Sequence, residues 1–244
     1  MSLQYVLLLM ILAGTMIGSV ATGKLTVAAA ITGGVLGVLV YAGAGFTGIA
    51  MVAVFFLMGT LATSWKKGYK ERAGLSEMNS SRRNAGQVVA NAGVAAICGL
   101  LCYFFQQYAF VLRLMMAASL SSAMADTLSS ELGNVYGRRF YNILTLQKDT
   151  RGLNGVVSLE GTGMGIAGSM VVALVYAIGF GIAWSTFMII VIAGTTGNLF
   201  DSVLGASLER KRYLNNDAVN FLNTAIAAVV ALILYIVLLP HQSA

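Results

Sequence analysis

The chain has 244 residues, of which 58% are hydrophobic and only 10% are charged, and its net charge is +6. Soluble domains carry about 25% charged residues, so this chain has too little polar surface to cover a water-exposed exterior. The composition excludes cytosolic nucleases, soluble enzymes with a Rossmann fold and secreted disulfide scaffolds. It predicts an integral membrane protein that forms a single domain over residues 1–244.

The predicted elements are membrane-spanning helices, each of which needs roughly 20 mostly apolar residues. The apolar runs lie at 3–22, 25–43, 46–64, 85–106, 109–128, 161–180, 183–204 and 218–239. The predicted fold class is therefore an all-α polytopic transmembrane helix bundle of about eight spans. Seven spans remain an alternative, because the break at residues 43–45 is also compatible with a kink inside one longer helix.

The basic residues orient this bundle. All of them except Arg113 fall in loops on one side, after the first, third, fifth and seventh spans. The longer loops on that side are 65–84, 129–160 and 206–217. Positive loops favour the cytoplasm, so we predict that both termini lie outside, in a bacterial inner membrane or an equivalent bilayer. Polar chemistry on one side favours an interfacial enzyme over a transporter, which usually has polar groups at the midplane.

A polar motif opens the predicted fourth span. Arg82 and Arg83 precede Asn84, Gln87 and Asn91, whose spacing places the three amides on one helical face. Amides at lipid level are costly to bury unless they have partners. We interpret this face as a binding site for a polar head group, with hydrogen bonding between helices as the alternative.

Carboxylates mark the predicted inner ends of two other spans. Asp126 and Glu131 follow a run of serines at the end of the fifth span, and Asp201 lies near the end of the seventh. Carboxylate oxygens are ligands that Mg²⁺ prefers. The pattern predicts a magnesium site formed by these three residues, and an ordinary solvated helix end is the alternative.

A glycine-rich loop leads into the predicted sixth span. It contains Lys148, Arg151, Asn154, Gly155 and Ser158. Free backbone N–H groups and a helix N-terminus favour an anion, and the two cations add positive charge. We interpret the segment as a cradle for phosphate, and a connecting loop with packing glycines is the alternative.

The last span opens with a second amide face, formed by Asn216, Asn220 and Asn223. The only histidine, His241, lies on the predicted outer tail, and the chain has no phosphate-binding P-loop motif. The remaining polar side chains are carboxylates, amides, hydroxyls and guanidinium groups. This set fits metal-assisted phosphoryl or nucleotidyl transfer, which depends mainly on positioning and charge neutralisation.

Four motifs in this order resemble the integral membrane family called domain of unknown function 92. They are the arginine–amide motif at 82–91, Ala125-Asp126-Thr127-x-x-Ser130-Glu131-x-Gly133, the loop at 154–162, and Phe200-Asp201-Ser202-x-Leu204-Gly205-Ala206. The resemblance spans about residues 10–240. That family includes transmembrane protein nineteen of animals and the phytyl-phosphate kinase of the plant and cyanobacterial vitamin E pathway. The regions around Asp126 and Asp201 look more distantly like those of dolichol kinases and phosphatidate cytidylyltransferases.

The resemblance implies a kinase that moves the γ-phosphoryl group of a nucleoside triphosphate, CTP or ATP, to an isoprenoid monophosphate. With the residue pattern, it leads us to expect Mg²⁺ on Asp126, Glu131 and Asp201. The loop at 148–158 and the amide and arginine motifs would bind phosphates. The alternatives are an enzyme that forms a CDP-lipid, a lipid or small-molecule transporter, and a purely structural membrane protein. The sequence leaves the oligomeric state open, with a homodimer as one option.

Overall fold

The computed structural model describes residues 3–75 and 82–239, so His241 and part of the predicted loop 65–84 lie outside the described residues. The elements are α1 (Leu3–Ala21), α2 (Val27–Ser64), α3 (Lys67–Arg72), α4 (Ala85–Phe104), the 3₁₀-helix η1 (Gln106–Tyr108), α5 (Ala109–Tyr136), β1 (Tyr141–Asn142), β2 (Val156–Val157), α6 (Leu159–Phe180), α7 (Trp184–Leu204), the π-helix η2 (Gly205–Glu209) and α8 (Asn216–Leu238). Over these residues the predicted all-α bundle is confirmed, and seven helices are long and apolar enough to cross a membrane.

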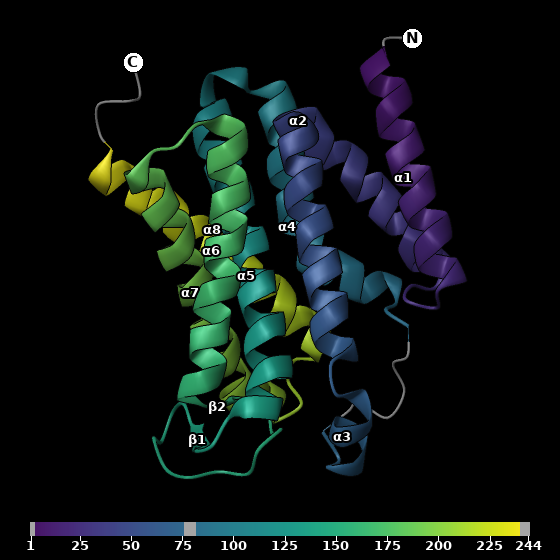
Figure 1. Ribbon diagram of the computed structural model, residues 1–244. Coiled ribbons are helices and arrows are strands. Elements are labelled where there is room, and N and C mark those ends of the chain that lie inside the picture. Colours follow the sequence, from purple (N-terminus) through teal and green to yellow (C-terminus); the bar gives the residue numbers. More distant parts are fainter. Residues whose placement is uncertain (1–2, 76–81, 240–244) are drawn as a thin grey trace.

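The predicted break at residues 43–45 is a sharp kink within α2. A straight helix of its 38 residues would be about 57 Å long, nearly twice the hydrocarbon thickness of a bilayer. At Gly45 the backbone leaves the helical region, with φ 56° and ψ −149°, a conformation that favours glycine. Lys24, just before α2, donates a hydrogen bond to Ser64 at its far end. The two halves of α2 therefore run in opposite directions along the bundle, which places both chain termini at the same end (Figure 1).

Helix α5 is the centre of the bundle. It packs against α2, α4, α6, α7 and α8, which also pack against one another around it, whereas α1 packs on α2 outside this ring (Figure 1). Glycines allow the closest approaches. A Cβ atom added to Gly194 or Gly197 of α7 would lie 2.1 Å from Ser121 Oγ or 2.2 Å from Ser122 Oγ of α5. The small serines of α5 and the glycines of α7 thus fix the spacing between these two helices.

The fifth span is longer than the sequence predicts. Helix α5 continues to Tyr136, so the predicted loop 129–160 begins with two helical turns, and Glu131 lies on the helix. The apolar run ends near residue 128, but the following side chains find polar partners, as Ser129 does with Asn198. Residues 137–158 then form a connection in which β1 and β2 pair antiparallel, at the end of the bundle opposite the termini (Figure 1).

Candidate functional site

A polar cleft of about 750 Å³ occupies the end of the bundle that carries α3 and the β-hairpin (Figure 1). Its walls come from the α1–α2 turn, from the helices α2 to α8, from the loop before α6 and from η2. The predicted site residues that line it are Arg83, Gln87, Asn91, Asp126, Glu131, Asn154, Gly155, Ser158, Asp201 and Asn220. Motifs that are far apart in the sequence therefore meet in one cleft.

Two carboxyl groups face each other in this cleft. Asp126 of α5 and Asp201 of α7 both line the cleft and are close enough for their side chains to interact. Asn223 Nδ2 of α8 donates to Asp201 Oδ1 over 2.7 Å, and Ser122 Oγ donates to Asn223 Oδ1 over 3.0 Å. Asn223 thus supports the carboxyl pair from behind instead of lining the cleft. Two carboxyl groups this close share either a proton or a cation.

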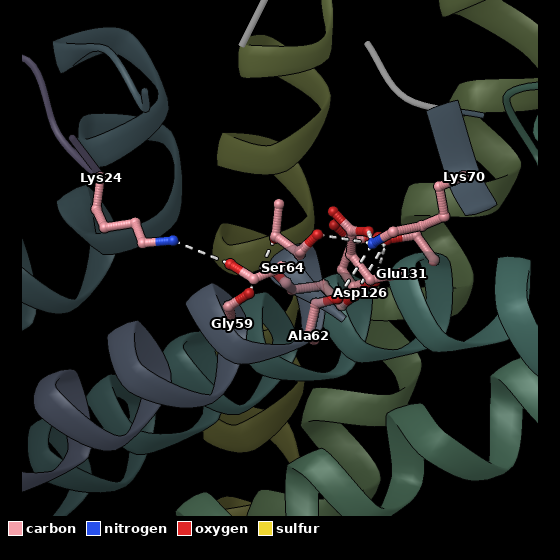
Figure 2. A network of polar contacts seen from close by, with 10 residues as sticks. Lys24, Gly59, Ala62, Ser64, Lys70, Asp126 and Glu131 are labelled. Carbon is pink, nitrogen blue, oxygen red and sulfur yellow. Dashed lines mark hydrogen bonds and ion pairs between the residues drawn. The ribbon is translucent and has the colours of Figure 1, made fainter. Parts of the chain in front are cut away.

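Glu131, the third predicted carboxylate, pairs with a lysine that no sequence pattern distinguishes. Lys70 of α3 contacts Glu131 and donates to the carbonyl oxygens of Ala62, at 3.1 Å, and Thr63, at 2.8 Å (Figure 2). Only 3% of the Lys70 side chain is exposed. Its charge offsets both Glu131 and the negative C-terminal end of α2.

The structure therefore brings together two of the three predicted carboxylate ligands. Among the described residues, no group of three or more His, Cys, Asp and Glu side chains is placed to hold a metal ion. Asp126 and Asp201 remain as an all-oxygen pair in the cleft, with Glu131 held by Lys70.

The predicted amide face of α4 is largely a helix cap. Asn84 Oδ1 accepts from the Gln87 backbone N–H, and Gln87 Oε1 accepts from that of Asn84, each over 3.0 Å. Asn91 Nδ2 donates to the Gln87 carbonyl over 2.8 Å. This reciprocal capping satisfies the first N–H groups of the helix. Gln87 and Asn91 still line the cleft, whereas Asn84 and Arg82 are exposed outside it.

Arg83, in contrast, enters the cleft. Its guanidinium carbon lies 5.8 Å from the ring centre of Phe55 and 6.0 Å from that of Phe56. Burial lowers the pKa of Arg83, and the charge of Glu131 opposes this effect. A guanidinium group stays protonated in proteins, so Arg83 brings a fixed positive charge to the cleft.

The predicted phosphate cradle is divided by the structure. Gly155 and Ser158 lie at the cleft, and Ser158 caps α6 by accepting from the Gly161 N–H over 3.1 Å. Lys148 is exposed outside it. Arg151 is also outside the cleft lining, because it stacks on Tyr69 at 5.3 Å and donates to the Tyr69 hydroxyl over 3.1 Å. Arg151 thus connects the loop to α3.

The same loop is tied to the end of α7. Arg210 Nε donates to the Asn154 carbonyl over 2.6 Å, and Arg210 Nη2 forms an ion pair of 2.8 Å with Asp149. The Arg210 hydrogen bond lowers the pKa of Asp149. Asn154 and Gly155 are held against the π-helix that follows α7 by these contacts.

Several cleft residues were not selected from the sequence. They are polar or charged side chains from four different segments, the α1–α2 turn, α3, α7 and η2: Lys24, Lys70, Asn198 and Glu209. Asn198 has a recognisable pattern, because it is an amide inside an apolar run, and its Oδ1 accepts from Ser129 over 3.1 Å. The two lysines resemble ordinary loop charges, and only their tertiary contacts distinguish them.

Relatives of this chain occur in cyanobacteria, plants and archaea. It is 35% identical to "Uncharacterized membrane protein sll0875" of Synechocystis sp. over 81% of this chain and 78% of that protein. It is 32% identical to "Protein VTE6, chloroplastic" of Arabidopsis thaliana over 82% of this chain, and the match spans 62% of the Arabidopsis protein. It is also 29% identical to "Uncharacterized membrane protein MJ0933" of Methanocaldococcus jannaschii, over 78% of this chain and 77% of that one.

No solved structure matches this chain significantly. The family described as "Integral membrane protein DUF92" matches residues 9–228, which is most of the chain and includes every described residue that lines the cleft. The chain therefore belongs to the DUF92 family of integral membrane proteins.

Proposed function

We propose that the protein is a Mg²⁺-dependent kinase that transfers the γ-phosphoryl group of CTP or ATP to an isoprenoid monophosphate. The observation that carries this proposal is the facing pair Asp126 and Asp201, in a cleft whose other walls carry Arg83 and lysines. Carboxylates beside cations suit a metal-bound triphosphate and an anionic acceptor. The family resemblance supplies the isoprenoid class of acceptor.

The donor atoms of the carboxyl pair fit Mg²⁺. This ion prefers oxygen ligands and is usually held by one or two carboxylates together with substrate phosphates. Asp126 and Asp201 would hold it, and Asn223 keeps Asp201 in position. When bound, the ion would neutralise charge on the triphosphate as the leaving group departs.

The remaining chemistry needs little from the protein besides positioning. The acceptor is itself a phosphate, so one of its oxygens can attack the γ-phosphorus without a strong general base. The bond from that phosphorus to the bridging oxygen breaks, and the nucleoside diphosphate leaves. Arg83 offers a guanidinium group to phosphate oxygens, which it can bind in a bidentate manner. The isoprenoid tail would remain in the bilayer beside the bundle.

We place the cleft on the cytoplasmic side of the membrane. The motivation is the distribution of charge, since the basic residues gather in the loops at the cleft end of the bundle. A nucleotide-dependent enzyme needs its site on this side, where the nucleotide is available.

Labelled nucleotides in sealed inside-out vesicles test the reaction and the orientation together. With Mg²⁺ and a panel of phytyl, farnesyl and geranylgeranyl monophosphates, the γ-label of added CTP or ATP should move to lipid, and the α-label should not. Transfer of the α-label with release of pyrophosphate would instead identify a CDP-lipid-forming enzyme. Activity in right-side-out vesicles alone would contradict the orientation.

A further inference from the structure

The turn between α1 and α2 is joined to the start of α4 by backbone hydrogen bonds. The Arg83 N–H donates to the Lys24 carbonyl over 2.9 Å, and the Thr26 N–H donates to the Arg83 carbonyl over 3.1 Å. Leu25 and Arg83 thereby form an isolated parallel bridge. This pairing holds Lys24 and Arg83 next to each other at one edge of the cleft, which both residues line.

These two cations have no acidic partner among the described residues. Lys24 Nζ donates only to the neutral hydroxyl of Ser64, over 3.0 Å (Figure 2). The Arg83 guanidinium lies against aromatic rings, and Glu131, the carboxylate whose charge acts on it, forms an ion pair with Lys70. Gly59 has no side chain and so leaves room for the Arg83 guanidinium group, since a Cβ atom at Gly59 would lie 3.0 Å from Arg83 Nη2.

Other cations near the cleft are already paired. Lys67 pairs with Glu71, Lys70 with Glu131, and Arg210 with Asp149. Lys24 and Arg83, which are adjacent through their backbones, thus both line the cleft and form no ion pair with a carboxylate in the part of the chain that the structure describes. A planar guanidinium beside an ammonium group is well suited to a phosphate.

This edge is distinct from the position of the carboxyl pair. Asp126 and Asp201 lie between α5, α7 and α8, whereas Lys24 and Arg83 lie between the α1–α2 turn, the end of α2 and the start of α4. An apolar cluster adjoins the cationic edge. Its buried members are Leu25, Ala29 and Ala30, and Met16, Val20, Phe56 and Val88 pack against them. The cluster itself is buried, but Val27 and Ile31 at the start of α2 are exposed, so positive charge and apolar surface lie close together here, as they do in a lipid phosphate.

We propose that Lys24 and Arg83 bind the phosphate of the lipid acceptor, a phosphomonoester on an apolar chain. The assignment of this ligand as the acceptor rests on the proposed kinase function. The carboxyl pair is then left for Mg²⁺ and the nucleotide. During transfer, one acceptor oxygen forms the bond to the γ-phosphorus while Lys24 and Arg83 hold the other two. The bond between the γ-phosphorus and the bridging oxygen breaks, and the nucleoside diphosphate departs.

Binding without turnover tests this site. Purified protein in nanodiscs is titrated with farnesyl monophosphate in the absence of nucleotide. The Kd should rise about tenfold or more in Lys24→Gln and in Arg83→Leu, because each removes a charge-assisted hydrogen bond to the phosphate. The Kd of the Mg²⁺–nucleotide complex should stay within about twofold of the wild-type value in both variants. Lys211→Gln, which removes an exposed lysine outside the cleft lining, is the matched control.

Farnesol and inorganic phosphate separate the two halves of the ligand. Farnesol should bind all variants equally, and inorganic phosphate should compete only weakly with farnesyl monophosphate. Competition at equal affinity would assign the site to free phosphate and overturn the lipid assignment. If Arg83→Leu is not monodisperse, Lys24→Gln and Arg83→Lys carry the test, with Arg83→Lys expected to bind more tightly than a neutral variant.

An unchanged Kd for farnesyl monophosphate in Lys24→Gln and the Arg83 variants would overturn the proposal. So would loss of nucleotide binding in place of lipid binding. A wild-type protein that binds farnesyl monophosphate through these residues, yet transfers no phosphoryl group, would contradict the kinase function alone.

Discussion

Lys70 and Lys67 lie one helical turn apart on α3, yet their surroundings differ. Lys70 is 3% exposed and contacts Glu131, whereas Lys67 is 56% exposed and lies 3.7 Å from Glu71. Exposed ion pairs contribute little to stability, but removal of one partner from a buried pair leaves a charge uncompensated. Lys70 therefore fixes α3 to α5 and to the end of α2, and Lys67 does not.

Replacement of these two lysines separates their contributions. Lys70→Met should lower the free energy of unfolding by about 1–3 kcal/mol, since Glu131 and two helix-end carbonyls lose their donor. Lys67→Met should change it by less than about 1 kcal/mol. Thermal unfolding in detergent measures both, and equal melting temperatures for the two variants would refute the structural role given to Lys70.

Among the site residues, the carboxylates are the most predictable from sequence. Asp126 and Asp201 are short ionisable side chains in otherwise apolar helices. A charge there is costly to bury without a partner or ligand, so such residues indicate a functional site. Loop lysines carry no such information, so Lys24 and Lys70 were not selected. The spacing of the amides at the start of α4 predicts a binding face, but Asn84 and Gln87 form a capping box instead. The same spacing fits both roles, so the sequence does not distinguish helix capping from ligand binding.

At the scale of elements, the loop before α6 depends on one glycine. Gly155 has φ 73°, and a Cβ there would lie 2.4 Å from both the backbone nitrogen and the Cβ of Ala206, and 2.5 Å from the Ser202 carbonyl. The loop can thus lie against the end of α7 only without a side chain at this position. This contact places Asn154 and Ser158 at the cleft.

Alanine at this position should displace the loop. Gly155→Ala should destabilise the protein by about 1–2 kcal/mol from the backbone conformation alone, with the clash adding to this loss, and it should lower transfer activity. Gly163→Ala is the control, because that helical glycine has no heavy atom within 4 Å of an added Cβ. It should raise stability by about 0.5–1 kcal/mol. Equal melting temperatures for the two variants would show that Gly155 is not required for the loop contact.

The limits of most helices could be predicted, and the exceptions have physical causes. Apolar runs locate α1, α4, α6, α7 and α8 within two residues at each end. Helix α5 extends past its apolar run because its polar end contacts polar side chains of other helices, which hydropathy cannot anticipate. The sequence predicts the position of the helix break at residues 43–45. Whether the break separates two helices or kinks one helix depends on the backbone angles at Gly45, which the hydropathy pattern does not specify.

In the molecule as a whole, α5, which bears Asp126, lies at the centre of a ring of five helices. The sequence predicted that polar groups gather at one end of the bundle, and the cleft confirms this. It did not predict which helices adjoin. Close approach between α5, α6 and α7 depends on the fit of particular glycines against particular serines, so the pairing of Asp126 with Asp201 follows from packing and not from sequence order.

The central claim is that this carboxyl pair supports phosphoryl transfer, and Asp126→Asn tests it most directly. Purified Asp126→Asn and Asp217→Asn proteins are assayed for transfer of the γ-label to an isoprenoid monophosphate over a range of Mg²⁺ concentrations. Asp217 lies in the first turn of α8, outside the cleft lining, so its variant is the matched control. Asp126→Asn should lower kcat about a hundredfold or more, because charge stabilisation by a metal ion is worth several kcal/mol, and Asp217→Asn should stay within about twofold of wild type. Full activity of a folded Asp126→Asn protein, with an unchanged requirement for Mg²⁺, would contradict the account.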